Sequence, residues 1–511
     1  MRTKNSLLNF LTSIVPFVVF VALGFLKIRV WQSSLDENIY ALNQLFFQLF
    51  AYLSIAEAGI GALVQKEYYK LLIDEDHDMI CKYYTVSKKM LRTVCYVIMA
   101  AGLILSFFLK YLAKDNALTQ MYMQEVFLLF LAKSLVEYFM FSPRFVLTAD
   151  QKLYKINFQM YFYRILETLM EIGLIYVGMS YVLVLCCSIV LRIVMNLHLN
   201  KIVFREYPWL HTVSDTQGLK IEGMKHVFIY KIVSAIQENV GALLISAFVN
   251  PISVIIYSNY KYITKYVNDF MYQMGAALTS SLGNLLYGEN NEEGYNTYEM
   301  INTMFYFMAS FLTIAVGYCI NSFIIIWVGE NKVLDSISLY CLLFVFFHNI
   351  ARRPQYILKD VFALYKELQL ISIAEAIVTL LLSYILVIHW GIKGILIAAV
   401  LAIIATNFWY FPIAVYKKIF NKFPILDFCK YFFCIGLISS MLWISNNYLP
   451  SISKQSFMMW FVCSCIYSIG ILVVLSVVYF LIFKSFRVLC RKGINVLKEL
   501  IINKRKTYEK L

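Results

Sequence analysis

The clearest chemical pattern in this sequence is formed by charged side chains that interrupt long apolar segments. Lys261, Lys265 and Asp269 recur every four residues, with Asn259 close by. In an α-helix this spacing places the three charged groups along one face. Two cations on one face suit an anionic ligand, whereas an ion pair between Lys265 and Asp269 would only hold the helix in register. The sequence alone leaves both interpretations open.

Other apolar segments contain charges at the same helical spacing. Lys231 and Glu238 are seven residues apart and therefore share a face, so we expect them to partner the stripe of Lys261 and its neighbours. Arg164, Glu167 and Glu171 follow an i, i+3, i+7 pattern. This pattern predicts an ion network between helices, or carboxylates that titrate with a coupling proton.

Further charged residues occupy apolar segments without forming a longer pattern. They are Glu57, Lys133, Glu137, Arg192 and Glu375. Lys133 and Glu137 are four residues apart, and we expect them to form a satisfied pair. Glu57 is followed by Ala58-Gly59-Ile60-Gly61, small residues that allow close contact between helices, so its carboxylate is expected to cap a neighbouring helix or to line a path.

Three arginines lie near the ends of apolar segments. Arg29 ends the first segment, where it either extends to the membrane surface or binds phosphate through its planar guanidinium group. Arg352 and Arg353 lie near the inner end of a later segment, where they either orient the chain or contact an anion.

Aromatic residues make up 17% of the chain, which is more than the two surfaces of a membrane require. Tyr257 and Tyr260 flank Asn259. They either pack between helices or contact sugar rings through their aromatic faces.

The composition indicates that these charges lie in a membrane protein. Hydrophobic residues account for 61% of the chain and charged residues for 15%, with a mean hydropathy of +0.68, whereas soluble domains have about 25% charged residues. A bilayer core ~30 Å thick needs about 20 mostly apolar residues per helix. About fourteen predicted spans lie near residues 7–29, 39–64, 91–111, 121–143, 156–178, 180–203, 227–249, 252–282, 300–327, 335–358, 367–389, 393–416, 428–447 and 458–483. A charge inside such a span costs a few kcal/mol, so it is expected to face a bundle interior or an aqueous cavity.

The basic residues are distributed unequally between alternate loops. Assigning loops to alternate sides places 32 lysines and arginines on one side and seven, including Lys27 and Arg29, on the other. The positive-inside rule then places both termini in the cytoplasm. The net charge of +14 therefore reflects membrane topology, and no nucleic-acid partner is expected.

The predicted fold class is all-α, a polytopic membrane protein of two pseudo-symmetric six-helix lobes and two C-terminal helices. The expected divisions are an N-lobe at 1–206, a cytoplasmic linker at 207–226, a C-lobe at 227–420, two further spans at 421–483 and a basic cytoplasmic tail at 484–511. The linker is predicted from the longest polar connection, which follows the sixth span.

No pattern typical of catalysis is present in the sequence. It has no glycine-rich phosphate loop, no helix with paired metal-binding histidines and no nucleophile elbow. The eleven cysteines lack the spacing of a metal site. We therefore expect no enzyme activity, no metal and no cofactor other than a coupling ion, H⁺ or Na⁺.

Local motifs that follow one another along the chain are more specific. They are Leu53-Ser54-Ile55-Ala56-Glu57-Ala58-Gly59-Ile60-Gly61, Tyr68-Tyr69-Lys70-Leu71, Tyr257-Ser258-Asn259-Tyr260, Ser281-Leu282-Gly283-Asn284-Leu285, Trp327-Val328-Gly329-Glu330, Arg353, Glu375-Ala376-Ile377, Gly391-Ile392-Lys393-Gly394 and Trp409-Tyr410-Phe411-Pro412. This series resembles bacterial polysaccharide transport proteins, the O-antigen-type, Wzx-like oligosaccharide flippases of the multidrug/oligosaccharidyl-lipid/polysaccharide (MOP) exporter superfamily, which is MATE-like. The resemblance extends to about Phe420. It departs at Tyr68-Tyr69-Lys70-Leu71, which lacks the family's proline, and at the double arginine Arg352-Arg353.

The resemblance implies a two-lobed bundle around a basic central cavity. Such a protein moves an undecaprenyl-pyrophosphate-linked oligosaccharide from the inner to the outer leaflet of the bacterial cytoplasmic membrane by alternating access. The cations expected to bind the pyrophosphate are Arg29, Lys231, Lys261, Lys265 and Arg353. Sugar contacts are expected from Tyr257, Asn259 and Tyr260, and ion coupling from Glu57, Glu238 and Asp269. Expected partners are membrane lipids, a glycan polymerase and other glycan-assembly proteins.

Three other functions remain open. An antiporter for cationic drugs on the same fold would favour an acidic cavity, which the basic stripe opposes. A membrane polymerase or transferase acting on the same glycolipid would need a catalytic residue, and the short external connections leave little room for one. A scaffold in a glycan-assembly complex would move no lipid by itself.

Overall fold

The computed structural model describes residues 2–53, 64, 67–68, 71–72, 74–113, 116–150, 152–216, 219, 224–286, 291–362, 364–449 and 456–491. The chain forms two compact units. Unit 1 comprises Met1–Ser258 and Leu380–Ile395, and unit 2 comprises Asn259–Thr379 and Leu396–Leu511. The boundary between Ser258 and Asn259 falls inside the predicted eighth span.

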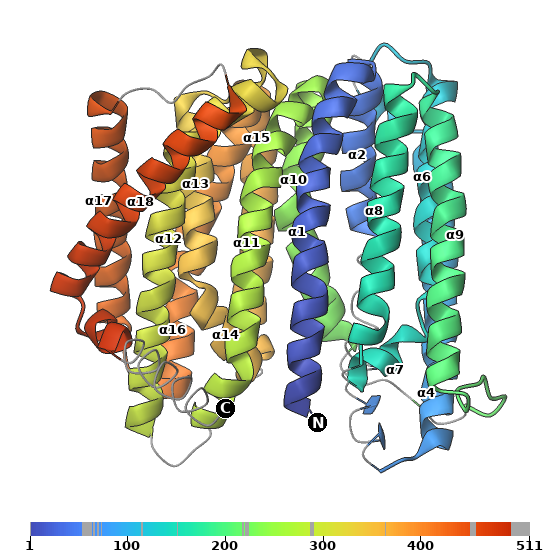
Figure 1. The fold of residues 1–511 in the computed structure, drawn as a ribbon, viewed down its shortest axis with the longest axis horizontal. Helices are drawn as coiled ribbons and strands as arrows, with labels where there is room; N and C mark the ends of the chain where they lie inside the picture. Colours follow the sequence, from blue (N-terminus) through green and yellow to red (C-terminus); the bar gives the residue numbers. More distant parts are fainter. Residues whose placement is uncertain are drawn as a thin grey trace, which may run out of the picture. The chain divides into compact units, whose positions relative to one another are not determined.

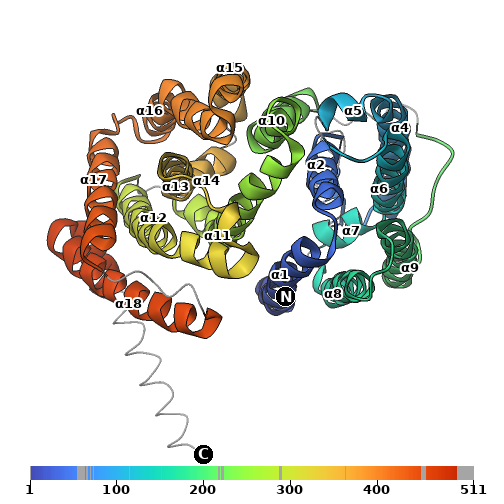
Figure 2. The same ribbon diagram turned by 90° about the horizontal axis from the view of Figure 1, so that it is seen from above.

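Unit 1 is built from helices that run side by side (Figure 1). They are α1 (Arg2–Ser34), α2 (Glu37–Leu53), α4 (His77–Ser106), α5 (Leu109–Leu112), α6 (Gln120–Met140), α7 (Arg144–Ala149), α8 (Tyr154–Tyr176), α9 (Tyr181–Glu206) and α10 (Met224–Phe248). Helix α1 packs against α8, and α6 packs against α4 and α9, as the view from above shows (Figure 2). Helix α10 packs against α2, which is why unit 1 continues beyond the predicted linker.

Unit 2 contains most of the remaining helices. They are α11 (Pro251–Leu286), α12 (Asn291–Val328), the short 3-10 helix η1 (Glu330–Lys332), α13 (Ser336–Ala351), α14 (Arg353–Val361), α15 (Tyr365–Ala405), α16 (Asn407–Phe420), α17 (Ile425–Tyr448) and α18 (Phe457–Ile482). Helix α12 is central, because it packs against α13, α17 and α18 (Figure 2). The first residues of α11 and the middle of α15 belong to unit 1.

Several helices start at a residue whose side chain accepts a hydrogen bond from a free backbone amide, the usual N-cap arrangement. Asp76 accepts from the amide of Met79 at 3.0 Å, and Thr119 accepts from Tyr122 at 3.3 Å. Asp76 also explains why α4 begins well before the predicted span 91–111, since the cap fixes the start of the helix at His77.

The surfaces of the helices indicate a lipid environment. By length and composition, six helices in the described part of the chain are apolar enough to cross a membrane. The most apolar, α18, exposes Phe461, Ile466, Val473 and Val477. Large exposed side chains of this kind are unfavourable in water and favourable against acyl chains, so they support the predicted membrane-spanning class.

Two predicted spans are broken in the structure. The span predicted at 335–358 consists of α13 and α14, with Arg352 at the junction between them. The span predicted at 393–416 is divided at Thr406 into the end of α15 and α16. Within α15, Gly391 has φ +53° and ψ −131°, which separates the predicted spans 367–389 and 393–416 without a loop.

Candidate functional site

Lys261, Lys265 and Asp269 lie on α11 with the spacing predicted from the sequence, and Tyr272 extends the same face. The Lys265 ammonium nitrogen lies 3.5 Å from a carboxylate oxygen of Asp269. Their side chains are 63% and 43% exposed, so this ion pair contributes at most about 1 kcal/mol to stability. The pair therefore forms, but its exposure leaves Lys265 able to exchange Asp269 for a stronger anion.

Arg353 joins this face from a neighbouring helix. It begins α14, and its guanidinium carbon lies 3.6 Å from the centroid of the Tyr272 ring, a cation–π contact. Gly275 makes room for the side chain, since a Cβ at that position would lie 3.2 Å from Arg353 Cγ and Nε. The Nε of Arg353 has no hydrogen-bond partner. Unit 2 thus brings three of the five predicted phosphate-binding cations, Lys261, Lys265 and Arg353, to the polar side of α11.

Arg352 has a different environment, although it adjoins Arg353 in the sequence. Its side chain is 2% exposed and forms an ion pair with Asp427 of α17. The guanidinium carbon also lies 4.6 Å from the centroid of the Tyr431 ring. Arg352 is therefore held inside unit 2, and Arg353 is the arginine of this pair that remains near the polar face of α11.

Asp427 was not predicted as a functional residue. Its carboxylate accepts hydrogen bonds from Asn302 at 2.9 Å, Gln355 at 3.0 Å and Tyr306 at 3.0 Å, in addition to the pair with Arg352. These contacts join α12, α14 and α17. In the sequence, Asp427 is a single carboxylate near the start of an apolar run. Such a residue cannot be distinguished from a loop residue without the structure.

A second buried ion pair lies on the same helices. Lys430 of α17 pairs with Glu299 of α12, and Lys430 also donates to the Thr303 hydroxyl at 3.1 Å. Tyr416 donates to Glu299 at 3.1 Å. Both side chains of this pair are only 10% exposed, so Lys430 is held inside unit 2 and not in a loop.

In unit 1, Lys27 and Arg29 lie within α1, which continues to Ser34, beyond the end of the predicted span 7–29. Lys27 pairs with Glu171 of α8 and lies 4.2 Å from the centroid of the Trp31 ring. Arg29 is exposed. Two residues correspond to ~200° around a helix, so Arg29 projects away from the side of α1 that carries Lys27.

Lys27 belongs to an ion network that spans four helices of unit 1. Lys133 of α6 lies 2.6 Å from Glu167 and 3.0 Å from Glu171, both on α8. Arg192 of α9 lies 2.6 Å from Glu167 and 2.7 Å from Glu137. The predicted pair of Lys133 with Glu137 is therefore wrong, because each of them binds residues of other helices.

Arg164 completes this network at its edge, 3.9 Å from Glu137. The network then contains four cations (Lys27, Lys133, Arg164 and Arg192) and three carboxylates (Glu137, Glu167 and Glu171). Glu167 and Glu171 are 6% and 3% exposed, whereas Lys27 and Arg164 are 28% and 33% exposed. The excess is thus positive, and each carboxylate pairs with at least one lysine or arginine, which does not favour the alternative of spare carboxylates that titrate.

The remaining predicted site residues lie elsewhere. Glu57 is outside the described residues, and Lys231 is described only as part of the α10 backbone. Glu238, also on α10, is exposed. Glu375 of α15 accepts a hydrogen bond from Asn407 and lies in unit 2, apart from the network with which it was grouped.

The three predicted sugar contacts are buried. Tyr257, Asn259 and Tyr260 are 7%, 2% and 0% exposed. The Tyr260 hydroxyl donates to Asn321 at 2.5 Å and accepts from the amide of Leu334 at 3.1 Å. None of the three presents its side chain at a surface of this structure, whereas Tyr272 on the same helix is 53% exposed.

Comparisons with known proteins concern the fold. No model of a known protein family matches the sequence, and no curated protein matches it either. A structure described as the lipid II flippase MurJ in an inward closed conformation aligns with a TM-score of 0.67 at 12% identity, covering 91% of this chain and 98% of that one.

Two further structures align over similar lengths. One is an inward-facing multidrug resistance MATE family transporter of the MOP superfamily, with a TM-score of 0.58 at 15% identity over 82% of this chain and 95% of that one. The other is a MOP superfamily transporter from Pyrococcus furiosus, described by the reversed polarity of its binding pocket, with a TM-score of 0.53 at 13% identity over 84% and 95%. The chain therefore has the fold of MOP-superfamily transporters, which confirms the predicted polytopic all-α class.

Proposed function

We propose that this protein is a flippase that moves an undecaprenyl-pyrophosphate-linked oligosaccharide from the inner to the outer leaflet of the cytoplasmic membrane by alternating access. The observation that carries the proposal is the polar side of α11, where Lys261 and Lys265 lie on one face of the helix and Arg353 of α14 joins that face through its contact with Tyr272. Only one acidic group, Asp269, lies on this stripe. The stripe therefore carries a net positive charge.

Keeping these cations within a membrane-spanning bundle has a free-energy cost of a few kcal/mol per charge, which implies contact with water or an anion. A pyrophosphate group is a suitable anion, because it offers several oxygens to donors at once. Arginine can bind two phosphate oxygens with its planar fork, and lysine contributes a compact charge. Lys265 and Arg353 both have a donor available, the first through an exposed ion pair and the second through its unpartnered Nε.

The charge of unit 1 supports the same class of ligand. Its network has one more cation than carboxylate, and the exposed Arg29 adds a further positive charge on α1. An antiporter for cationic drugs would be expected to expose carboxylates instead. The most buried carboxylates of unit 1, Glu167 and Glu171, are already paired with lysine or arginine.

The fold is compatible with this proposal. The aligned MurJ structure is described as a flippase of lipid II, and the MATE structure as a multidrug transporter. These descriptions support only the general activity of moving a molecule across the membrane. The proposed substrate rests on the cations near α11. In this proposal both termini face the cytoplasm, coupling uses H⁺ or Na⁺ through Glu57, Glu238 or Asp269, and a glycan polymerase receives the product.

Reconstitution with a fluorescent polyprenyl-pyrophosphate oligosaccharide tests the proposal. Translocation by the unaltered protein is compared with translocation by Lys261→Ala, Lys265→Ala and Arg353→Ala. Loss of one hydrogen bond to a charged group costs about 1.5–3 kcal/mol, so each variant should be slower by roughly tenfold or more. Lys417→Ala is the matched control, since Lys417 is an exposed lysine near the end of α16.

Each alternative function gives a different result. Rates that are equal in all four variants would reject the assignment of these cations. Transport of cationic dyes without transport of the glycolipid would instead indicate an antiporter. Formation of a longer glycan by the purified protein would indicate a polymerase, and a protein that is folded but moves no lipid would indicate a scaffold.

A further inference from the structure

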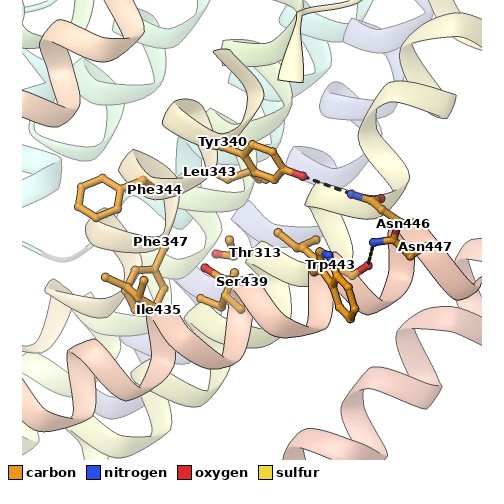
Figure 3. Close-up of a pocket in the computed structure, with 12 residues that line it drawn as sticks. Thr313, Tyr340, Leu343, Phe344, Phe347, Ile435, Ser439, Trp443, Asn446 and Asn447 are labelled. Atoms are coloured by element: carbon orange, nitrogen blue, oxygen red, sulfur yellow. Dashed lines mark hydrogen bonds between the residues drawn. The ribbon is translucent and has the colours of Figure 1, made fainter. Parts of the chain in front are cut away.

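A groove in unit 2 is lined by none of the cations described above. It has a volume of about 480 Å³ and runs between α13 and α17, with α12 behind it (Figure 3). Its floor is formed by Leu343, Phe347, Ile438 and Leu442, which are 1–7% exposed. This volume is within the range of about 300–1,000 Å³ that is typical of pockets for small molecules.

Polar groups are concentrated at one end of the groove. Tyr340 lies near the start of α13, and Trp443, Asn446 and Asn447 lie in the last turns of α17. Asn446 donates to the Tyr340 hydroxyl at 3.3 Å, which leaves the hydroxyl hydrogen of Tyr340 for another acceptor (Figure 3). These four side chains lie at helix ends, where Trp and Tyr are enriched at the membrane surface.

A second polar position lies halfway along the groove. Thr313 of α12 is 1% exposed, and its hydroxyl has no hydrogen-bond partner. It points toward the groove beside Ser439 (Figure 3). An unpaired hydroxyl in a low-dielectric environment is unfavourable, so this position calls for an acceptor from an occupant. Ser439 and Asn446 are seven residues apart on α17, so they are separated by ~10 Å along the helix axis.

The lining contains no charged side chain. A pyrophosphate headgroup needs several cations, so this groove does not recognise the headgroup of the proposed substrate. Hydroxyl, amide and indole donors instead match neutral acceptors, such as the carbonyl oxygens of an ester. Beyond Thr313 the groove continues along Ile435 and Phe347, which offer only apolar surface.

We propose that this groove binds one acyl chain of a membrane phospholipid. The ester carbonyl lies near Thr313 and Ser439, the chain runs along Ile435 and Phe347, and the headgroup lies beyond Tyr340 and Asn446. The gradient from polar helix ends to an apolar floor follows the gradient from the surface to the core of a bilayer. This inference requires that α13 and α17 span the membrane, and it does not depend on the proposed substrate.

The test uses vesicles that contain a phosphatidylethanolamine with a photoreactive diazirine in one acyl chain. After illumination, labelled peptides of the full-length protein are mapped by mass spectrometry. We expect labelling in α13 and α17 of the unaltered protein, at residues of the groove. Ser439→Trp fills the groove and should reduce this labelling at least fivefold. Ser440→Trp is the control, because Ser440 is also exposed but does not line the groove.

Mapping in the unaltered protein does not require either variant to fold, so the inference remains testable if a variant is lost. Labelling of α13 and α17 no stronger than that of the exposed surface of α18 would overturn it. Equal labelling of Ser439→Trp and Ser440→Trp would also overturn the inference. Competition by unlabelled polyprenyl phosphate but not by unlabelled phosphatidylethanolamine would identify a different occupant and would also overturn the inference.

Discussion

Arg352 and Asp427 form an almost completely buried ion pair that connects the break between α13 and α14 to the start of α17. The break leaves backbone groups without the hydrogen bonds of a continuous helix, and buried polar side chains surround it. Asn302 and Gln355 complete the shell of donors around the carboxylate. Since α17 contributes the anion, the thirteenth predicted span belongs structurally to unit 2.

The first prediction concerns this pair. Asp427→Asn leaves the Arg352 charge unpaired inside unit 2, and removal of one member of a buried pair costs about 3–5 kcal/mol. We expect a large decrease in the melting temperature of the detergent-solubilised protein, measured by fluorescence-detected size exclusion. Asp74→Asn is the control, because Asp74 is exposed, and it should change stability by less than about 0.5 kcal/mol. An equal effect of both substitutions would contradict the structural role of Asp427.

The second prediction concerns the ion network of unit 1. Arg192 and Glu167 lie 2.6 Å apart on α9 and α8, in a partly buried site. A double-mutant cycle with Arg192→Met and Glu167→Gln should give a coupling energy of roughly 1–3 kcal/mol in thermal unfolding.

The exposed pair of Lys418 and Glu367, 3.7 Å apart, provides the comparison for this cycle. Its coupling energy should be below about 1 kcal/mol, because solvent screens exposed pairs. Additive effects of Arg192 and Glu167 would show that the network does not join the helices energetically.

The third prediction concerns Gly391 in α15. Its φ of +53° with ψ of −131° is accessible to glycine and strained for other residues, so Gly391→Ala should destabilise the protein by about 1–3 kcal/mol. The cause is the backbone and not crowding, since a Cβ at this position would lie 3.6 Å from its nearest neighbour, Val249.

Gly436→Ala is the matched control for this backbone effect. Gly436 lies within α17, and no atom would lie within 4 Å of an added Cβ. Alanine is favoured over glycine in a helix by about 0.5–1 kcal/mol, so stability should stay the same or rise. The two variants should therefore shift the melting temperature in opposite directions, or only Gly391→Ala should lower it. A decrease of the same size in both would contradict the explanation.

The fourth prediction concerns the orientation of the chain. The basic residues favour cytoplasmic termini, so Ser34→Cys at the end of α1 should react with a membrane-impermeant maleimide in intact cells. Lys417→Cys near the end of α16 should react only after permeabilisation. Both are examined after replacement of the eleven native cysteines. Reaction of Lys417→Cys but not of Ser34→Cys in intact cells would place the termini outside the cytoplasm and contradict the proposed orientation.

Much of the helical architecture could be predicted from hydropathy. In a bilayer the backbone must satisfy its own hydrogen bonds, so an apolar run of about 20 residues forms a helix whatever its neighbours are. The predicted spans 156–178 and 428–447 correspond closely to α8 (Tyr154–Tyr176) and α17 (Ile425–Tyr448) for this reason. The stripe of Lys261 and Lys265 on α11 was equally predictable, because it depends only on helical periodicity.

Pairing between helices could not be predicted in this way. Lys133 is four residues from Glu137, yet it binds Glu167 and Glu171, because the packing of α6 against its neighbours decides which carboxylates it reaches. Arg352 and Arg353 are adjacent in the sequence, yet Arg352 is buried in an ion pair and Arg353 is half-buried against Tyr272, since consecutive residues at a helix junction point in different directions.

The sequence by itself thus determined that the chain is a bundle of membrane-spanning helices with cations placed inside them. Hydrophobic length and helical spacing are local properties, and they are sufficient for that conclusion. Only the tertiary structure decided which charges neutralise one another and which remain near a surface. That choice depends on contacts between residues far apart in the chain, such as Arg352 with Asp427 and Lys27 with Glu171, and no local pattern records those contacts.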